Sequence, residues 1–190
     1  MAMNVLTVIV SVAAFVAAAV SMEFVAKFMH KYVMHGSGWC LHYDHHNTSG
    51  HGLQRNDLYF FFFAGLSFLL IFNGLRLSWY PMASAGFGVG LYGIGYVVFH
   101  DIMYHGRIKA LKFKPKHPYL RRILNAHRVH HATVTKDGAL SYHFLWAPKK
   151  YDPRNQPEVD RQLDEIRKMQ MELKRREKEQ EKVERENSET

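Results

Sequence analysis

The chain has 190 residues, 47% of them hydrophobic, and a formal net charge of +8. The last forty residues hold 10 Lys/Arg and 12 Asp/Glu, so residues 1–150 carry 15 basic side chains against 5 acidic ones. Because the basic residues alternate with long apolar runs, the composition argues against nucleic acid as a partner and favours contact with membrane lipid. The single cysteine, Cys40, excludes an internal disulfide.

Three apolar stretches have a length and composition that suit membrane helices: residues 3–22, 58–72 and 82–99. A bilayer core of about 30 Å needs about 20 helical residues. The first stretch spans if it continues to Phe28, and the second is short unless Leu75 and Leu77 belong to it. A signal peptide is the alternative for the first stretch, but residues 1–4 lack Lys and Arg. We predict an all-α integral membrane protein with about three spans.

Basic residues gather at one end of the predicted spans. The connection 73–81 has one cation, Arg76, beside the interface aromatics Trp79 and Tyr80. The opposite ends are flanked by Lys27, Lys31, Arg55, Arg107, Lys109, Lys112, Lys114 and Lys116. Since loops rich in Lys and Arg stay on the cytoplasmic side, we expect an inner-membrane protein whose N-terminus lies outside and whose basic end faces the cytoplasm.

Ten of the thirteen histidines form four groups beside the predicted spans. The groups are His30 and His35; His42, His45 and His46; His100 and His105; His127, His130 and His131. Their spacing reads HxxxxH, HxxHH, HxxxxH, HxxHH, so two patterns occur twice in the same order. Three spans place all four groups on one side of the membrane. The repeat therefore indicates one shared metal site.

Helical geometry predicts that the shared site is dinuclear. Positions i, i+3 and i+4 share one helix face, but neighbours such as His45 and His46 diverge by about 100°. This divergence favours one ligand to each of two metals. The HxxxxH pairs are about 140° apart on an ideal α-helix, so we expect them to flank the site or to lie where a helix ends. The site should form a histidine-rich helical cap just beneath the membrane surface.

The choice of metal follows from what the chain lacks. Imidazole binds iron, zinc, copper and nickel alike, but a structural zinc site needs four ligands, usually with cysteine. The carboxylate-bridged di-iron site of soluble bundles needs several glutamates, and residues 1–150 contain only Glu23. An all-histidine di-iron centre that activates dioxygen remains.

Polar neighbours of the histidines are candidates for orienting the rings. Asp44, Asp101 and Asn125 can accept hydrogen bonds from ring N–H groups, which metal-bound histidines usually make; solvated polar residues or helix caps are the alternative. Three histidines lie outside the repeat and are expected in loops or on the surface: His51, His117 and His143.

Several longer segments are distinctive beyond their histidine spacing. In the first half they are MEFVAKFMHKYVMHGSGWCLHYDHH (residues 22–46) and NDLYFFFF (56–63). In the second half they are HDIMYHGRI (100–108), PYLRRILNAHRVHHA (118–132) and LSYHFLWAP (140–148). These segments resemble the bacterial carotene β-ring hydroxylases. The similarity includes motifs such as HGxGW and YLRRxxxAHRxHH, whose residues other than histidine are not expected in fatty-acid and sterol hydroxylases.

The resemblance implies a di-iron monooxygenase with two iron ions and dioxygen as co-substrate. It implies hydroxylation at carbon 3 of the β-ionone rings of β-carotene, which gives β-cryptoxanthin and then zeaxanthin. Electrons would come from a ferredoxin-type donor supplied with NAD(P)H. Access of the carotenoid from the bilayer is expected past aromatic residues that can equally be packing residues: Trp39, Tyr43, Tyr96, Phe99 and Tyr104. The alternatives are a carotenoid ketolase, a fatty-acid or sterol hydroxylase, and a metal transporter or store.

The last part of the chain differs from the rest. Composition divides the chain into a membrane-embedded histidine domain, residues 1–150, and a charged, partly helical or disordered tail, residues 151–190. Because the tail has few apolar residues, we expect a solvated, frayed helix rather than a coiled coil that docks a partner. Deletion of residues 158–190 is then expected to leave activity largely intact.

Overall fold

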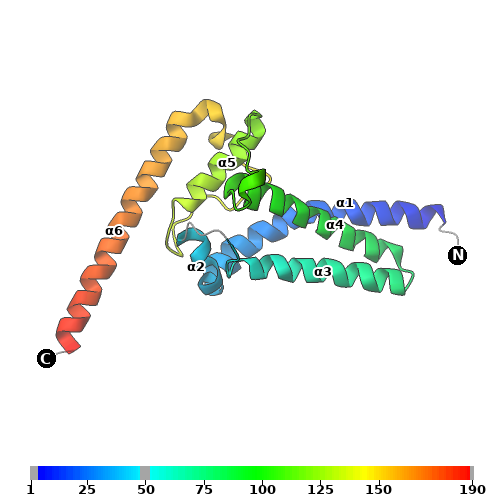
Figure 1. The fold of residues 1–190 in the computed structure, drawn as a ribbon, viewed down its shortest axis with the longest axis horizontal. Helices are drawn as coiled ribbons and strands as arrows, with labels where there is room; N and C mark the ends of the chain where they lie inside the picture. Colours follow the sequence, from blue (N-terminus) through cyan, green and yellow to red (C-terminus); the bar gives the residue numbers. More distant parts are fainter. Residues whose placement is uncertain (1–3, 48–51, 189–190) are drawn as a thin grey trace.

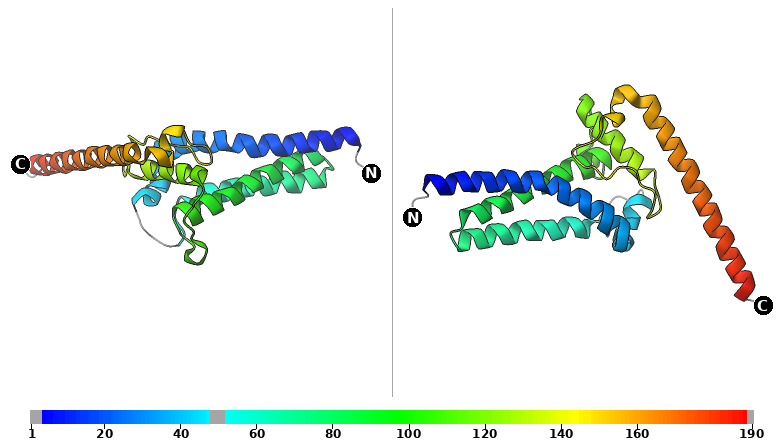
Figure 2. Two further views of the ribbon diagram at one scale, coloured as in Figure 1. Left: turned by 90° about the horizontal axis from the view of Figure 1, so that it is seen from above. Right: turned by 180° about the vertical axis from the view of Figure 1, so that it is seen from behind.

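Three long apolar helices dominate the computed structural model, which describes residues 4–47 and 52–188. By length and composition these helices can cross a membrane, and they cover Val5–Ser37, Asp57–Arg76 and Tyr80–Tyr104. They run beside one another in all the views of Figures 1 and 2. No strand occurs in the described ranges. The predicted all-α class with three spans is confirmed.

The helices extend beyond the apolar stretches that predict them. α1 (Val5–Phe28) is capped at its N-terminus by Asn4, whose side chain accepts a hydrogen bond from the Thr7 N–H. α3 (Asp57–Arg76) has 20 residues and ends at its C-cap Leu77, so the short middle stretch becomes a helix of about 30 Å, long enough to span. The third helix, α4 (Tyr80–Tyr96), begins with a proline in its first turn.

α4 packs against both α1 and α3, and three of its contacts depend on glycine. A Cβ at Gly88 would lie 2.4 Å from the carbonyl oxygen of Phe15 in α1, and one at Gly86 would lie 2.8 Å from Ile71 in α3. At Gly90 a Cβ would lie 3.0 Å from Ser67 Oγ. Small residues let helix backbones approach closely where lipid supplies no hydrophobic force between helices. Gly95 has no atom within 4 Å of its Cβ position, so the glycines do not all serve this packing.

α1 and α4 change helical type as they approach the histidines. α1 continues into the π-helical segment η1 (Met29–Ser37), which is kinked at Gly36, and α4 continues into the π-helical segment η2 (Val97–Tyr104). At the end of η2 the His105 N–H donates to the His100 carbonyl at 3.0 Å, the i to i+5 bond of a π-helix. π-helical turns are rare in proteins as a whole, but those that occur are often found at functional sites. Here each of the two π-helical segments coincides with an HxxxxH pair.

A small cap closes the end of the bundle opposite to the α3–α4 turn (Figure 1). Its histidine-bearing helices are α2 (Trp39–Asn47) and α5 (Pro118–His131). Three short 3₁₀ turns complete it: η3 (Lys109–Leu111), η4 (Lys149–Tyr151) and η5 (Pro153–Asn155).

Glu23 ties this cap to the membrane bundle. Its carboxylate, on α1, accepts hydrogen bonds from the backbone N–H groups of Phe144, Leu145 and Trp146 at 2.9–3.1 Å. The Tyr92 hydroxyl, on α4, donates to the same carboxylate at 2.9 Å. A charge at this depth is costly unless it is paired, and four donors satisfy this one.

The charged tail forms one helix, α6 (Gln156–Ser188). The prediction of a solvated helix is wrong for its first half, because Val159, Leu163 and Ile166 are at most 4% exposed and share a core with α5. Their i, i+4, i+7 spacing makes one apolar stripe. Farther along, Met171 is 65% exposed, and the helix runs away from the rest of the molecule (Figure 2). Because deletion of residues 158–190 would remove these core residues, the structure argues against the expectation that activity survives it. The division into residues 1–150 and 151–190 stays a prediction.

Replacing Gly88 by Ala should destabilise the bundle, whereas Gly95→Ala should not. The added methyl group at Gly88 meets the α1 backbone, while at Gly95 it meets nothing within 4 Å and gains up to about 1 kcal/mol of helix propensity. The unfolding midpoint of each variant is measured by heating the protein in detergent and quantifying the folded fraction by size-exclusion chromatography. Equal unfolding midpoints for the two variants would contradict the assigned α1–α4 contact.

Candidate metal centre

The four histidine groups of the sequence meet at the cap end of the bundle. Within them, ligand nitrogens lying within 4.8 Å of one another form two sets. The first histidine set consists of His30, His35, His42, His46 and His130. The second histidine set consists of His45, His100, His105 and His127. Nine of the ten predicted ligands therefore lie in two sets, each of which can hold a metal ion.

Helix geometry explains how the histidines are distributed between the sets. His45 and His46 are neighbours on α2 but belong to different sets, as their predicted divergence requires. His30 and His35 belong to the same set, and so do His100 and His105. The expectation that an HxxxxH pair diverges assumes α-helical geometry. In a π-helix residue i+5 lies about one turn from residue i, so both histidines of a pair can point to the same set.

His131 lies between the two sets. Its ring stacks on His46 of the first set with centroids 4.3 Å apart, and its centroid lies 4.3 Å from that of His127 in the second set. The His131 Nε2 atom is buried and has no hydrogen-bond partner among the described residues. A ring in this position can contribute a lone pair to the site, so all ten predicted histidines gather in one place.

Oxygen atoms fix the protonation of five rings. His42 Nδ1 lies 2.6 Å from Asn56 Oδ1, and His45 Nδ1 lies 3.1 Å from Gln54 Oε1. The other three Nδ1 atoms contact the carbonyls of Lys136 (from His35) and Thr133 (from His46), and the Asp101 carboxylate (from His100). Because these oxygens only accept, each Nδ1 carries the proton, and each Nε2 presents a lone pair to the interior.

These Nε2 lone pairs point at one another. The Nε2 atoms of His42 and His46 are 3.1 Å apart, and those of His45 and His100 are 3.0 Å apart. Two lone pairs at this separation repel. Two imidazole nitrogens that bind one ion at about 2.1 Å and at right angles also lie about 3 Å apart. The donor set and its spacing therefore fit metal ions.

Burial keeps the repeat histidines of α2 and α5, together with His105, neutral. Loss of water lowers the pKa of His42 to about 3, that of His46 to about 2, and that of His105 to about 4. It also lowers the pKa of the other repeat histidines of α2 and α5: His45, His127, His130 and His131. A group whose pKa is far below 7 is deprotonated at neutral pH, and neutral imidazole is the form that binds metal.

One of the three predicted orienting residues is confirmed. Asp101 accepts from His100 Nδ1 at 2.9 Å. The prediction for Asn125 is wrong, because its amide donates to the Tyr151 carbonyl and to Gln156 Oε1 and so joins α5 to α6. Asp44 accepts from the Arg55 backbone N–H at 2.8 Å.

The remaining acceptors were not predicted from the sequence. Asn56 directly precedes α3 and is 2% exposed, and an amide beside a span and near histidines is the only sequence signal for it. No sequence signal points to the carbonyls of Thr133 and Lys136, because every residue carries a backbone carbonyl.

Arg107 connects the second histidine set to the start of α3. Its guanidinium binds both Asp57 oxygens at 2.6–2.7 Å and lies 3.2 Å from Asp101. Hydrogen bonding to Asp57 raises the pKa of Arg107 further above its ordinary range, so the charge is permanent. Because Asp57 holds the guanidinium in place, its contact with Asp101 fixes that carboxylate, which in turn accepts from His100 Nδ1.

Two of the three histidines outside the repeat, His117 and His143, are described, and neither belongs to either set. His117 is exposed and caps α5 by accepting from the Tyr119 N–H at 3.2 Å. His143 is half-buried, lies against Trp146, and lines the cavity described next. His51 lies outside the described residues.

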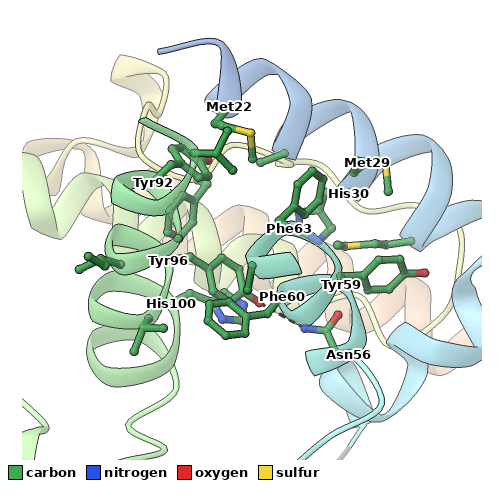
Figure 3. A pocket seen from close by; sticks show the side chains of 18 of the residues that line it. Met22, Met29, His30, Asn56, Tyr59, Phe60, Phe63, Tyr92, Tyr96 and His100 are labelled. Carbon is green, nitrogen blue, oxygen red and sulfur yellow. Dashed lines mark hydrogen bonds between the residues drawn. The ribbon is translucent and has the colours of Figure 1, made fainter. Parts of the chain in front are cut away.

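An apolar cavity of about 430 Å³ extends from the histidines between α1, α3 and α4 (Figure 3). Its membrane part is lined by Met22, Phe60, Phe63, Val89 and Tyr92. At its inner end are members of both histidine sets: His30, His42, His100 and His127. Of the five aromatic residues expected beside the substrate path, only Tyr96 lines this cavity in the described ranges.

Fold and site together define a helical membrane protein with a buried histidine cluster that could hold metal ions. The chain is similar to the β-carotene hydroxylase of Pantoea ananas, with 42% identity over 68% of this chain and 73% of that protein. The β-carotene hydroxylase of Pseudescherichia vulneris is 38% identical over 80% and 81%. The chloroplastic β-carotene 3-hydroxylase 1 of Arabidopsis thaliana is 31% identical over 72% of this chain and 44% of its own length.

The chain belongs to the β-carotene hydroxylase family, whose members are enzymes. No protein-family profile matches it. No solved structure matches it either.

Replacing His46 by Ala should reduce bound metal from about two ions per chain to one or fewer, because the first histidine set loses a converging Nε2. His117→Ala should bind as much metal as the wild type and lose only a helix cap, about 1 kcal/mol. Elemental analysis of protein purified anaerobically with added iron measures both. Wild-type metal content in His46→Ala would refute its role as a ligand.

Proposed function

We propose that this protein is a di-iron monooxygenase that hydroxylates carbon 3 of the β-ionone rings of β-carotene. The observation that carries the proposal is the position of two converging histidine sets at the inner end of an apolar cavity between membrane helices. Membership of the β-carotene hydroxylase family supports the substrate. All ten histidines of the repeat are proposed as ligands.

Iron is the proposed metal because hydroxylation needs a redox change. Zinc binds imidazole equally well but has no redox chemistry. In the net reaction one oxygen atom of dioxygen enters the C–H bond, and the other leaves as water after taking up two electrons and two protons. Two iron ions, held by the two histidine sets, would supply the activation of dioxygen. The electrons are proposed to come from a ferredoxin-type donor supplied with NAD(P)H.

The proposed role of the side chains is to orient the histidine rings and to bind the substrate, and not to transfer protons. The oxygen acceptors of Asn56, Gln54 and Asp101 fix the ring tautomers, and the apolar lining of the cavity keeps water from the ring. Because residues of both histidine sets line the inner end, a β-ionone ring bound there would lie against members of both sets. No general acid or base is needed for the ring itself.

The substrate is proposed to enter from the bilayer. β-Carotene dissolves in lipid, and the cavity lies among three helices whose outward side chains are apolar and exposed, such as Phe62 and Phe68. After the first hydroxylation the carotenoid leaves, turns round and presents its other ring. This sequence gives β-cryptoxanthin and then zeaxanthin.

With β-carotene, an electron donor and ¹⁸O-labelled dioxygen, the protein should form the 3-monohydroxy product first and the 3,3′-diol later, with label in each hydroxyl. Mass spectrometry of the carotenoids measures this, and His46→Ala serves as the inactive control. Product without label would overturn the oxygenase assignment. A 4-keto product would indicate a ketolase, and modified fatty acid or sterol without carotenoid product another histidine-box enzyme.

The metal centre is proposed to face the cytoplasm, since Lys109, Lys112 and Lys114 follow η2 on an exposed segment while Arg76 is the one cation near the α3–α4 turn. In a Cys40→Ser background, Ser78→Cys should react with an impermeant thiol reagent added outside intact cells, and Lys114→Cys only after lysis. Both positions are exposed, so burial does not explain a difference. The reverse pattern would invert the proposed topology.

A further inference from the structure

The loop that follows α5 supplies two of the oxygens that orient the first histidine set. The Thr133 carbonyl accepts from His46 Nδ1 at 2.7 Å, and the Lys136 carbonyl accepts from His35 Nδ1 at 2.9 Å. Both are backbone atoms. The directions of the two rings therefore depend on the path of residues 133–136.

Gln170 of α6 holds this loop. Its side-chain Oε1 accepts from the Val134 N–H at 3.2 Å and from Thr135 Oγ1 at 3.0 Å. These two donors lie in the chain between the carbonyls of Thr133 and Lys136. The Gln170 side chain is 3% exposed, so water does not replace it readily.

The first half of α6 is fixed well enough to position the loop. Val159, Leu163 and Ile166 anchor it in the core that it shares with α5. Near the loop, a Cβ at Gly138 would lie 3.3 Å from Met169 Cε. Gly138 has a φ of +91°, which disfavours other residues. The helix, the loop and α5 thus form one packed unit.

We propose that Gln170 is a positioning residue for the metal centre: its amide oxygen holds residues 133–136 where their carbonyls orient His35 and His46. The proposal rests on the metal-binding role proposed above. It assigns a function to part of the tail that composition alone presents as a solvated helix. The exposed half beyond Met171 takes no part in it.

The test compares Gln170→Leu with Gln170→Glu in the full-length protein. Leucine has a similar volume but no acceptor, whereas glutamate keeps an oxygen for both donors. Leu163→Ala is the control, because it weakens the same helix in the core without touching the loop. The readouts are the dissociation constant for cobalt(II) as the metal probe, its ligand-field absorption spectrum, and the thermal unfolding midpoint.

Gln170→Leu should weaken cobalt binding about 10- to 100-fold and change the absorption spectrum. Gln170→Glu should restore both toward wild type. Leu163→Ala should lower the unfolding midpoint but leave the spectrum unchanged. Wild-type affinity in Gln170→Leu, or the same loss in Leu163→Ala, would overturn the proposal while the proposed function stands. Absence of metal binding by the wild type would overturn both.

Truncation gives an independent arm. A chain that ends at Arg176 keeps Gln170 and should bind cobalt as the wild type does. A chain that ends at Lys168 keeps the core residues of α6 but lacks Gln170, and should resemble Gln170→Leu. Equal affinities for the two truncated chains would contradict the role of Gln170.

Discussion

The convergence of neutral imidazole nitrogens in a dry interior is the constraint on which the rest of the structure depends. Lone pairs such as those of His42 and His46, 3.1 Å apart, repel each other unless a cation lies between them. The protein must therefore hold each ring against this repulsion. It does so from the other ring nitrogen, through oxygens that accept from Nδ1. These acceptors come from the segment just before α3, from η2 and from the loop after α5, so a bound metal ion would stabilise the arrangement of these elements.

The π-helical segments solve a problem of direction. A membrane helix must keep its backbone hydrogen bonds satisfied in lipid, so η1 and η2 cannot unwind freely to aim their histidines. A change from i+4 to i+5 bonding rotates the following residues while the backbone bonds persist. His30 and His35 then reach one histidine set from α1, and His100 and His105 reach the other from α4. Rigid spans thus bring histidines to the site with little loop in between.

Two polar contacts join parts of the chain that differ in composition. Glu23 accepts three backbone N–H bonds from residues 144–146, and so fixes a wall of the cavity to α1. Gln170 accepts hydrogen bonds from Val134 and Thr135, and so fixes the loop beside the first histidine set to α6. In both cases one buried acceptor organises a short irregular segment, which cannot satisfy its own N–H groups. The shape of the site therefore depends on buried acceptors that are not themselves members of the histidine sets.

The sequence by itself determined the three spans, the all-α class and the histidines that gather at one site. Apolar length and the repeated spacing are local properties, and they need no knowledge of neighbours. Division of His45 and His46 between two sets also followed from helical periodicity alone. Only the tertiary structure decided that the HxxxxH pairs lie in π-helical segments or directly at their end, that backbone carbonyls orient His35 and His46, and that the first half of α6 belongs to the core. The reason is that a carbonyl looks the same at every position, and a sparse apolar stripe is buried only when another helix offers it a partner.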